Sequence, residues 1–194
     1  PASATILVNT SGYLCVSKWG KPGRGASLLH GGEFMAPMYG LAIDQQGSIF
    51  VVDNGNNRIQ KFDRTGNFII LWGNFGAANA IFHNPTGIAC DAKGDVYVVD
   101  TNNHRVQKFD TSTNVLPQLL TKWGGSSEAG HASSPLAQEA GQLRSPWGIA
   151  VDGQGDVYVT DTGNHRVEKF DREGNFIAQW GGFGGGDGQF NFPY

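Results

Sequence analysis

Short apolar runs separated by turn residues recur along the whole chain. The run Gly-Ile-Ala-Val over 148–151 is apolar throughout, which is typical of a strand covered on both faces. An Asp and a Gly follow it and favour a tight turn, because Asp bonds its own backbone and Gly accepts a positive φ. The β-branched and aromatic run 157–160 suits a packed, pleated surface. A mixed run over 166–170 is the third strand of this unit. A fourth, apolar run closes each unit, as 67–72 does in an earlier one, so the pattern has four short strands.

The same order of runs occurs three times. The matching segments are Pro37–Asp44, Pro85–Asp91 and Pro146–Asp152, then the turn glycines Gly47, Gly94 and Gly155, then Ser48–Asp53, Asp95–Asp100 and Asp156–Asp161, then Asn57–Asp63, His104–Asp110 and His165–Asp171, and finally the Trp-Gly pairs at 72–73, 123–124 and 180–181. The first two units are 47 residues apart and the next two are 61 apart. The surplus of 14 residues lies around 111–117 and 126–140. Longer surface loops cost little chain entropy, so neither insertion alters the repeat.

Four antiparallel strands in a unit of this length predict a blade of a β-propeller. The motifs Pro-x-Gly-Ile-Ala-Val-Asp, Val-Tyr-Val-x-Asp, Asn-His-Arg-Val-x-Lys-Phe and Trp-Gly resemble the NHL repeat, named for its Asn-His-Leu triplet. The resemblance implies an all-β fold of four-stranded blades, with a complete ring of about six. We expect one partial propeller domain over 1–194. Its parts are the last two strands of a blade (1–20), three complete blades (32–73, 80–124 and 141–181) and the lead-in to another blade (188–194).

An incomplete ring exposes strand edges and apolar blade faces, which favour association. We therefore expect partners: further blades that complete the ring, from the same longer chain or from another subunit, or other proteins. A ring of two identical halves is the rival arrangement.

Three acid–base pairs keep a constant separation of five residues: Asp53 and Arg58, Asp100 and Arg105, and Asp161 and Arg166. A catalytic interpretation would make them charge partners in a reaction. A pair repeated in every blade more plausibly braces the turn between the second and third strands, because the planar arginine fork bonds carboxylate and carbonyl together. We predict that the pairs are structural.

Four residues stand immediately before the first strands, where a propeller has its channel mouth: Tyr39, Thr86, Trp147 and Tyr194. Aromatic rings gathered there would form a stacking platform for a peptide, a glycan or single-stranded nucleic acid. The alternative is that Tyr39 and Trp147 pack between blades. We take the four residues as candidate ligand contacts.

Composition narrows these possibilities. Of the 194 residues, 16 % are charged and the formal net charge is −3, which argues against a surface that grips phosphates. No apolar run reaches the roughly 20 residues of a membrane span. The five histidines show no ligand spacing, so we expect no metal and no cofactor. Cys15 and Cys90 occupy different strand positions and favour small buried hydrophobes over a disulfide.

These features favour a non-enzymatic binding or scaffold module that engages protein or glycan partners through the mouth and the blade edges. The low charge and the many Gly, Asn and Thr residues favour an extracellular, periplasmic or cell-surface setting. The resemblance also implies two alternatives. One is a propeller lyase or hydrolase with a metal on the axis. The other is a single-stranded RNA-binding NHL domain, against which the lack of basic character argues.

Overall fold

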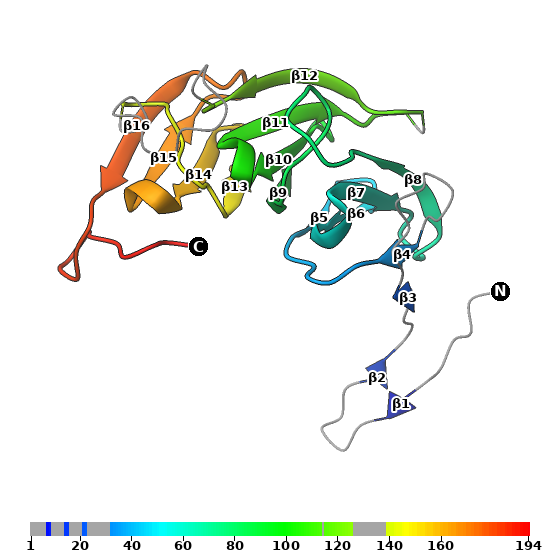
Figure 1. Cartoon of the computed structure of the whole chain (residues 1–194). Coiled ribbons are helices and arrows are strands. Elements are labelled where there is room, and N and C mark those ends of the chain that lie inside the picture. The colour runs from blue at the N-terminus through cyan, green and yellow to red at the C-terminus, as the bar shows by residue number, and fades with distance from the viewer. Residues whose placement is uncertain (1–6, 9–13, 16–20, 23–31, 114, 126–138) are drawn as a thin grey trace.

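A computed structural model describes residues 7–8, 14–15, 21–22, 32–113, 115–125 and 139–194. Most of 32–194 forms three four-stranded antiparallel sheets (Figure 1). From the inner edge outward, the first sheet consists of β5 (Leu41–Ile43), β6 (Ile49–Asp53), β7 (Arg58–Phe62) and β8 (Phe68–Trp72). The second consists of β9 (Pro85–Cys90), β10 (Val96–Asp100), β11 (Arg105–Asp110) and β12 (Gln118–Trp123). The third consists of β13 (Ile149–Val151), β14 (Val157–Asp161), β15 (Arg166–Phe170) and β16 (Phe176–Gly181). The expected all-β fold of four-stranded units is confirmed.

The sheets fan out from their first strands. Strand β9 lies beside both β5 and β13, while β8, β12 and β16 lie on the outside of the arc (Figure 1). Short 3-10 turns join the second strand to the third in every sheet: η1 (Asn54–Asn56), η2 (Thr101–Asn103) and η4 (Thr162–Asn164).

Two short pairs of strands precede the first sheet. Strands β1 (Leu7–Val8) and β2 (Leu14–Cys15) pair antiparallel, and β3 (Lys21–Pro22) pairs parallel with β4 (Glu33–Phe34). The expectation that 1–20 supply the last two strands of a blade falls mostly outside the described residues, including the closing Trp19.

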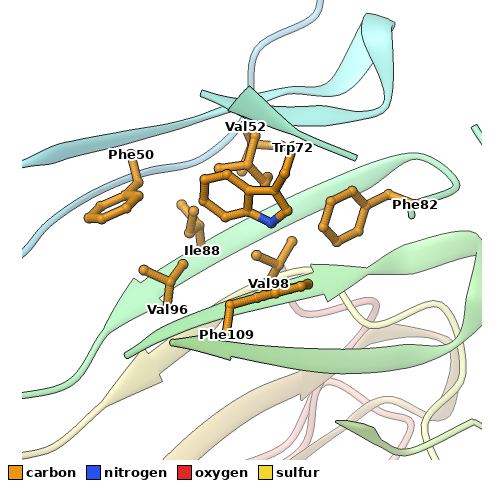
Figure 2. Close-up of a cluster of buried hydrophobic side chains, with 9 residues drawn as sticks. Phe50, Val52, Trp72, Phe82, Ile88, Val96, Val98 and Phe109 are labelled. Carbon is orange, nitrogen blue, oxygen red and sulfur yellow. The ribbon is translucent and has the colours of Figure 1, made fainter. Parts of the chain in front are cut away.

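The hydrophobic core lies between neighbouring sheets rather than within one. The first and second sheets enclose an aromatic and β-branched cluster: Phe50, Val52, Ile59, Trp72, Phe82, Ile88, Val96, Val98 and Phe109 (Figure 2). The second and third sheets enclose the equivalent cluster, which includes Tyr97, Val99, Val106, Leu143, Val157, Val159 and Phe170. Every blade therefore buries both faces only when it has a neighbour on each side.

Two glycines set how closely the inner strands approach. A Cβ built on Gly40 would lie 2.5 Å from the carbonyl oxygen of Thr86, and one built on Gly87 would lie 2.5 Å from that of Trp147. Real Cβ atoms do not tolerate such distances to backbone. Gly40 and Gly87 thus allow the first and second blades to touch the lead-in of the next blade.

The third sheet carries an uncovered blade face, whereas the first sheet is uncovered only along its inner strand. Strands β10 and β11 of the central sheet are buried along almost their whole length, whereas β14 and β15 alternate between buried and partly exposed residues. Trp180 is 43 % exposed, while Trp72, its counterpart inside the arc, is 2 % exposed. At the other end, Leu41 and Ile43 of β5 are exposed, but β6 and β7 are buried along almost their whole length. The uncovered half of an inter-blade core therefore lies on the third sheet.

Candidate binding face

Strand direction divides the molecule into two faces. All inner strands start at one face, which we call the mouth face; the 3-10 turns η1, η2 and η4 and the ends of the outer strands lie there too. The turns between first and second strands, and between third and fourth strands, lie at the opposite face. This arrangement follows from the antiparallel order within each sheet.

Three of the four predicted contact residues come together at the mouth face. The ring centroids of Tyr39 and Trp147 are 5.1 Å apart, and those of Trp147 and Tyr194 are 5.2 Å apart, both edge to face. Tyr39 is 50 % exposed and Tyr194 is 73 % exposed, with Trp147 partly buried between them. We call Tyr39, Trp147 and Tyr194 the aromatic row.

Thr86 differs from the expectation that its side chain sits at the surface of the mouth. It is buried, and its hydroxyl donates to the carbonyl oxygen of Trp147 at 2.9 Å and bonds the hydroxyl of Thr101 at 2.8 Å. A small residue in the lead-in of the second blade leaves room for the rings of Tyr39 and Trp147 to meet. Thr86 therefore contacts the backbone of Trp147 from the interior, and its side chain is not accessible at the surface of the mouth face.

The same face carries exposed rings that the sequence prediction missed. Phe75 and Phe183 are both largely exposed and follow outer strands in the equivalent motif Trp-Gly-x-Phe-Gly. Phe75 packs edge to face on His83, and His165 packs between Phe183 and Phe192. The repetition of Trp-Gly-x-Phe-Gly at 72–76 and 180–184 was the signal that could have identified these rings.

Charge is distributed unequally between the two faces. The residues that lead directly into the inner strands, 37–39, 85–86, 146–147 and 193–194, contain no charged side chain, although the lead-in before Trp147 contains Glu139 and Arg144. The opposite face carries the acidic turns, which begin at Asp44, Asp63, Asp91, Asp110, Asp152 and Asp171. Hydrogen bonds from Thr65 and Asn67 hold the pKa of Asp63 below its usual range, and hydrogen bonds from Ser112 lower the pKa of Asp110. These carboxylates hold turns closed.

The three predicted acid–base pairs meet as buried ion pairs. Arg58 Nε lies 2.7 Å from an Asp53 oxygen, and the pairs Arg105–Asp100 and Arg166–Asp161 have the same distance. Each carboxylate also accepts a backbone N–H from the lead-in of its own blade; the donors are Met35, His83 and Arg144. Burial raises the pKa of Asp100 and of Asp161. Their oxygens are occupied by these structural bonds.

The residue before each of these arginines joins neighbouring blades. Asn57, His104 and His165 all have the left-handed backbone conformation. Asn57 Oδ1 accepts the N–H of Asn84 at 2.7 Å, and His104 Nδ1 accepts that of Ser145 at 2.9 Å. His165 Nδ1 accepts the N–H of Phe192 at 3.1 Å, so the segment before Tyr194 docks on the third blade as the earlier lead-ins dock on theirs.

Candidate chemistry elsewhere is sparse. Within the described residues no three His, Cys, Asp or Glu side chains gather as metal ligands would. Burial raises the pKa of the Cys90 thiol to about 12, which keeps it protonated. No helix among the described residues is long and apolar enough to cross a membrane.

Comparison with known proteins agrees with this architecture. The NHL repeat matches residues 40–62, 82–109 and 143–170. The Protein brain tumor of Drosophila melanogaster is 47 % identical over 53 residues, which are 27 % of this chain and 5 % of that protein. The B-box type zinc finger protein ncl-1 of Caenorhabditis elegans is 56 % identical over 39 residues, 20 % of this chain and 5 % of that protein. The matched segments are thus a small part of these relatives.

Solved structures show the same fold at low identity. A streptogramin B lyase has a TM-score of 0.56 and 16 % identity, over 90 % of this chain and 46 % of its own. The virginiamycin B lyase of Staphylococcus aureus with quinupristin has a TM-score of 0.55 and 14 % identity, over 90 % of this chain and 47 % of its own. The chain thus spans about half of these propellers. The three matches to the repeat, together with the three sheets, identify this chain as an NHL-repeat protein built of β-propeller blades.

Proposed function

We propose that the chain is a non-enzymatic binding module that engages a protein partner through its mouth face. The aromatic row carries this proposal. Its rings are fixed edge to face at about 5 Å, yet Tyr39 and Tyr194 keep half or more of their surface accessible. Tyr and Trp are the residues that contribute most to protein interfaces, since they bury a large area at little cost in side-chain entropy.

The charge distribution favours an apolar partner surface. The residues that lead directly into the inner strands are uncharged, and the same face carries the exposed rings of Phe75, Phe183 and Phe192. A partner that relied on phosphates would require Lys and Arg at this face, because the phosphate backbone supplies most of the affinity for nucleic acid. We infer that the partner presents apolar side chains, as a polypeptide segment does.

Further blades are the second class of partner that we propose. The uncovered face of the third sheet carries Trp180, the equivalent of the buried Trp72 inside the arc. Lys61 and Lys108 donate to carbonyls of the next blade, at Thr111 and Arg172. Lys108 and Lys169 each also pair with an aspartate of their own blade, Asp95 and Asp156. An added blade would supply the carbonyl for Lys169.

A selected peptide tests the binding proposal. Peptides are selected from a displayed random library on the chain, and the affinity of one is measured for wild type, Trp147→Ala and Leu116→Ala. We expect Trp147→Ala to weaken binding at least about 30-fold, as for an interface hot spot. Leu116, exposed in the turn at the opposite face, serves as the control and should leave the affinity unchanged.

The same titration with a uridine oligonucleotide at low and high salt covers the nucleic-acid alternative. Equal peptide affinity of wild type and Trp147→Ala would exclude the row as the binding site. Tight oligonucleotide binding that weakens steeply with salt and needs Trp147 would replace the protein partner with RNA.

A further inference from the structure

One buried position differs in chemistry between otherwise equivalent blades. The third residue of the third strand is Gln60 in the first blade, Gln107 in the second and Glu168 in the third, and all three are fully buried. In the first two blades the amide Oε1 accepts a lead-in N–H, from Gly32 at 2.8 Å and from Ala80 at 3.0 Å. The glutamine thereby holds the lead-in of its blade.

The amide nitrogen of each glutamine makes two further bonds. Gln60 Nε2 donates to Asp53 at 3.0 Å and to the carbonyl of Glu33 at 2.6 Å. Gln107 Nε2 donates to Asp100 at 3.1 Å and to the carbonyl of Ile81 at 2.9 Å. Two acceptors thus face the nitrogen in each of these blades.

Glu168 reproduces only the acceptor half of this arrangement. Its Oε1 accepts the N–H of Gly141 at 3.1 Å and pairs with Arg166 Nη2 at 2.9 Å. Its Oε2 is buried and has no hydrogen-bond partner. By equivalence with the glutamine nitrogens, Oε2 occupies the place that faces Asp161 and the carbonyl of Gln142.

Burial favours a proton on this side chain, against the charge of Arg166. Strand β15 contributes Arg166, strand β14 contributes Asp161, and the lead-in contributes the Gly141 N–H. One arginine therefore serves two buried carboxyl groups. Burial raises the pKa of Glu168 from 4.5 to about 7; Asp161 raises it too, while Arg166 and Gly141 oppose the shift.

We propose that Glu168 is a proton-dependent latch on the lead-in segment 139–144. In the neutral acid, the protonated Oε2 of Glu168 donates a hydrogen bond, as the amide Nε2 of the glutamine does in the other blades. Ionisation removes that donor and leaves a second buried negative charge beside Asp161. Arg166 already holds the segment through the carbonyls of Glu139 and Gln142, so loss of the proton weakens a shared network. The segment continues into Trp147, but the latch is tested without any ligand.

The sign of the pH effect follows from the raised pKa. Below pH 4.5 Glu168 is protonated in both folded and unfolded chains, and its contribution to stability is fully present. That contribution falls as the pH rises to about 7 and is constant above it.

Unfolding by urea between pH 4.5 and 8.5 tests the latch in wild type and Glu168→Gln. We divide the folded-to-unfolded ratio of Glu168→Gln by that of wild type at each pH. We expect this quotient to rise on the order of a hundredfold between pH 4.5 and 8.5. Gln107→Glu is the matched variant, because it places the same acid beside Asp100 and Arg105 and should add a second loss of stability at high pH. Hydrogen exchange at Gly141 provides the local readout and should accelerate with pH in wild type beyond its intrinsic rate, but not in Glu168→Gln.

Parallel pH profiles of wild type and Glu168→Gln would overturn the proposal, whether or not Gln107→Glu folds. So would Gly141 exchange that has the same pH dependence in both proteins.

Discussion

At the scale of single residues, buried polar contacts explain why the same polar residues, such as the Asp and the Arg, recur in each repeat. The aspartate at the end of each second strand is completely buried, which is costly for a carboxylate unless every lone pair is satisfied. Asp100 meets this condition with Arg105, Asn103, Gln107 and the His83 N–H. The constant spacing of five residues between Asp and Arg brings together a carboxylate and a guanidinium that bond two strands and a lead-in, and we predict that this role is structural.

Arg105→Ala tests this structural role. Removing one partner of a buried pair leaves Asp100 uncompensated, so we expect a loss of about 3–5 kcal/mol in the free energy of unfolding, measured by urea denaturation. Arg64, exposed in a turn of the first blade, is the control; Arg64→Ala should change stability by no more than about 0.5 kcal/mol. Unchanged unfolding of Arg105→Ala together with loss of peptide binding would instead assign the pair to the functional site.

At the scale of elements, contact between blades depends on the first strands. Gly40, just before β5, and Gly87, within β9, each lie against the backbone of the following blade's lead-in. The aromatic row lies on those same lead-ins, so the spacing of inner strands also sets the spacing of the rings.

Gly87→Ala examines this coupling. The added methyl group would lie 2.5 Å from the carbonyl of Trp147, so the blades must separate, and overpacking of this kind costs about 1–3 kcal/mol. Gly153→Ala is the matched control, because nothing lies within 4 Å of a Cβ built there. Thermal unfolding should show a lower melting temperature for Gly87→Ala only. Equal melting temperatures of the two variants would show that the contact between Gly87 and the carbonyl of Trp147 accommodates a methyl group without loss of stability.

At the scale of the whole molecule, the arc leaves half a core uncovered on its third sheet. The indole of Trp72 lies against Phe50 and Phe109 inside the arc, whereas that of Trp180 contacts Tyr158 and remains 43 % exposed. The repeated sequence provides the same apolar side chains in both places, and the presence of a neighbour decides whether they are buried.

Replacing each tryptophan by alanine distinguishes the two environments. We expect Trp72→Ala to cost about 3–5 kcal/mol of stability and Trp180→Ala less than half as much, as judged from urea midpoints at constant slope. Equal costs would mean that the face around Trp180 is covered in solution, and sedimentation of the wild-type chain would then show an assembly.

Much of the fold was predictable because the repeat provides three independent views of the same strand pattern. Turn residues such as Gly47, Gly94 and Gly155 each adopt the positive φ that the Asp-x-x-Gly motif requires. The candidate site was predictable only in part. Position before the inner strand identified Tyr39, Trp147 and Tyr194, but burial of Thr86 depends on its bond to the carbonyl of Trp147, 61 residues away. Phe75 and Phe183 were missed because they lie beyond the repeat's recognised motifs.

The bonds from Asn57, His104 and His165 to the following lead-ins have an evolutionary consequence. Both sides of every junction use the same chemistry, so a junction does not depend on which two blades it joins. Removing or duplicating one whole unit, cut at equivalent positions, would recreate each hydrogen bond with a new neighbour. Such a chain can change its size in steps of one blade without inventing a new contact.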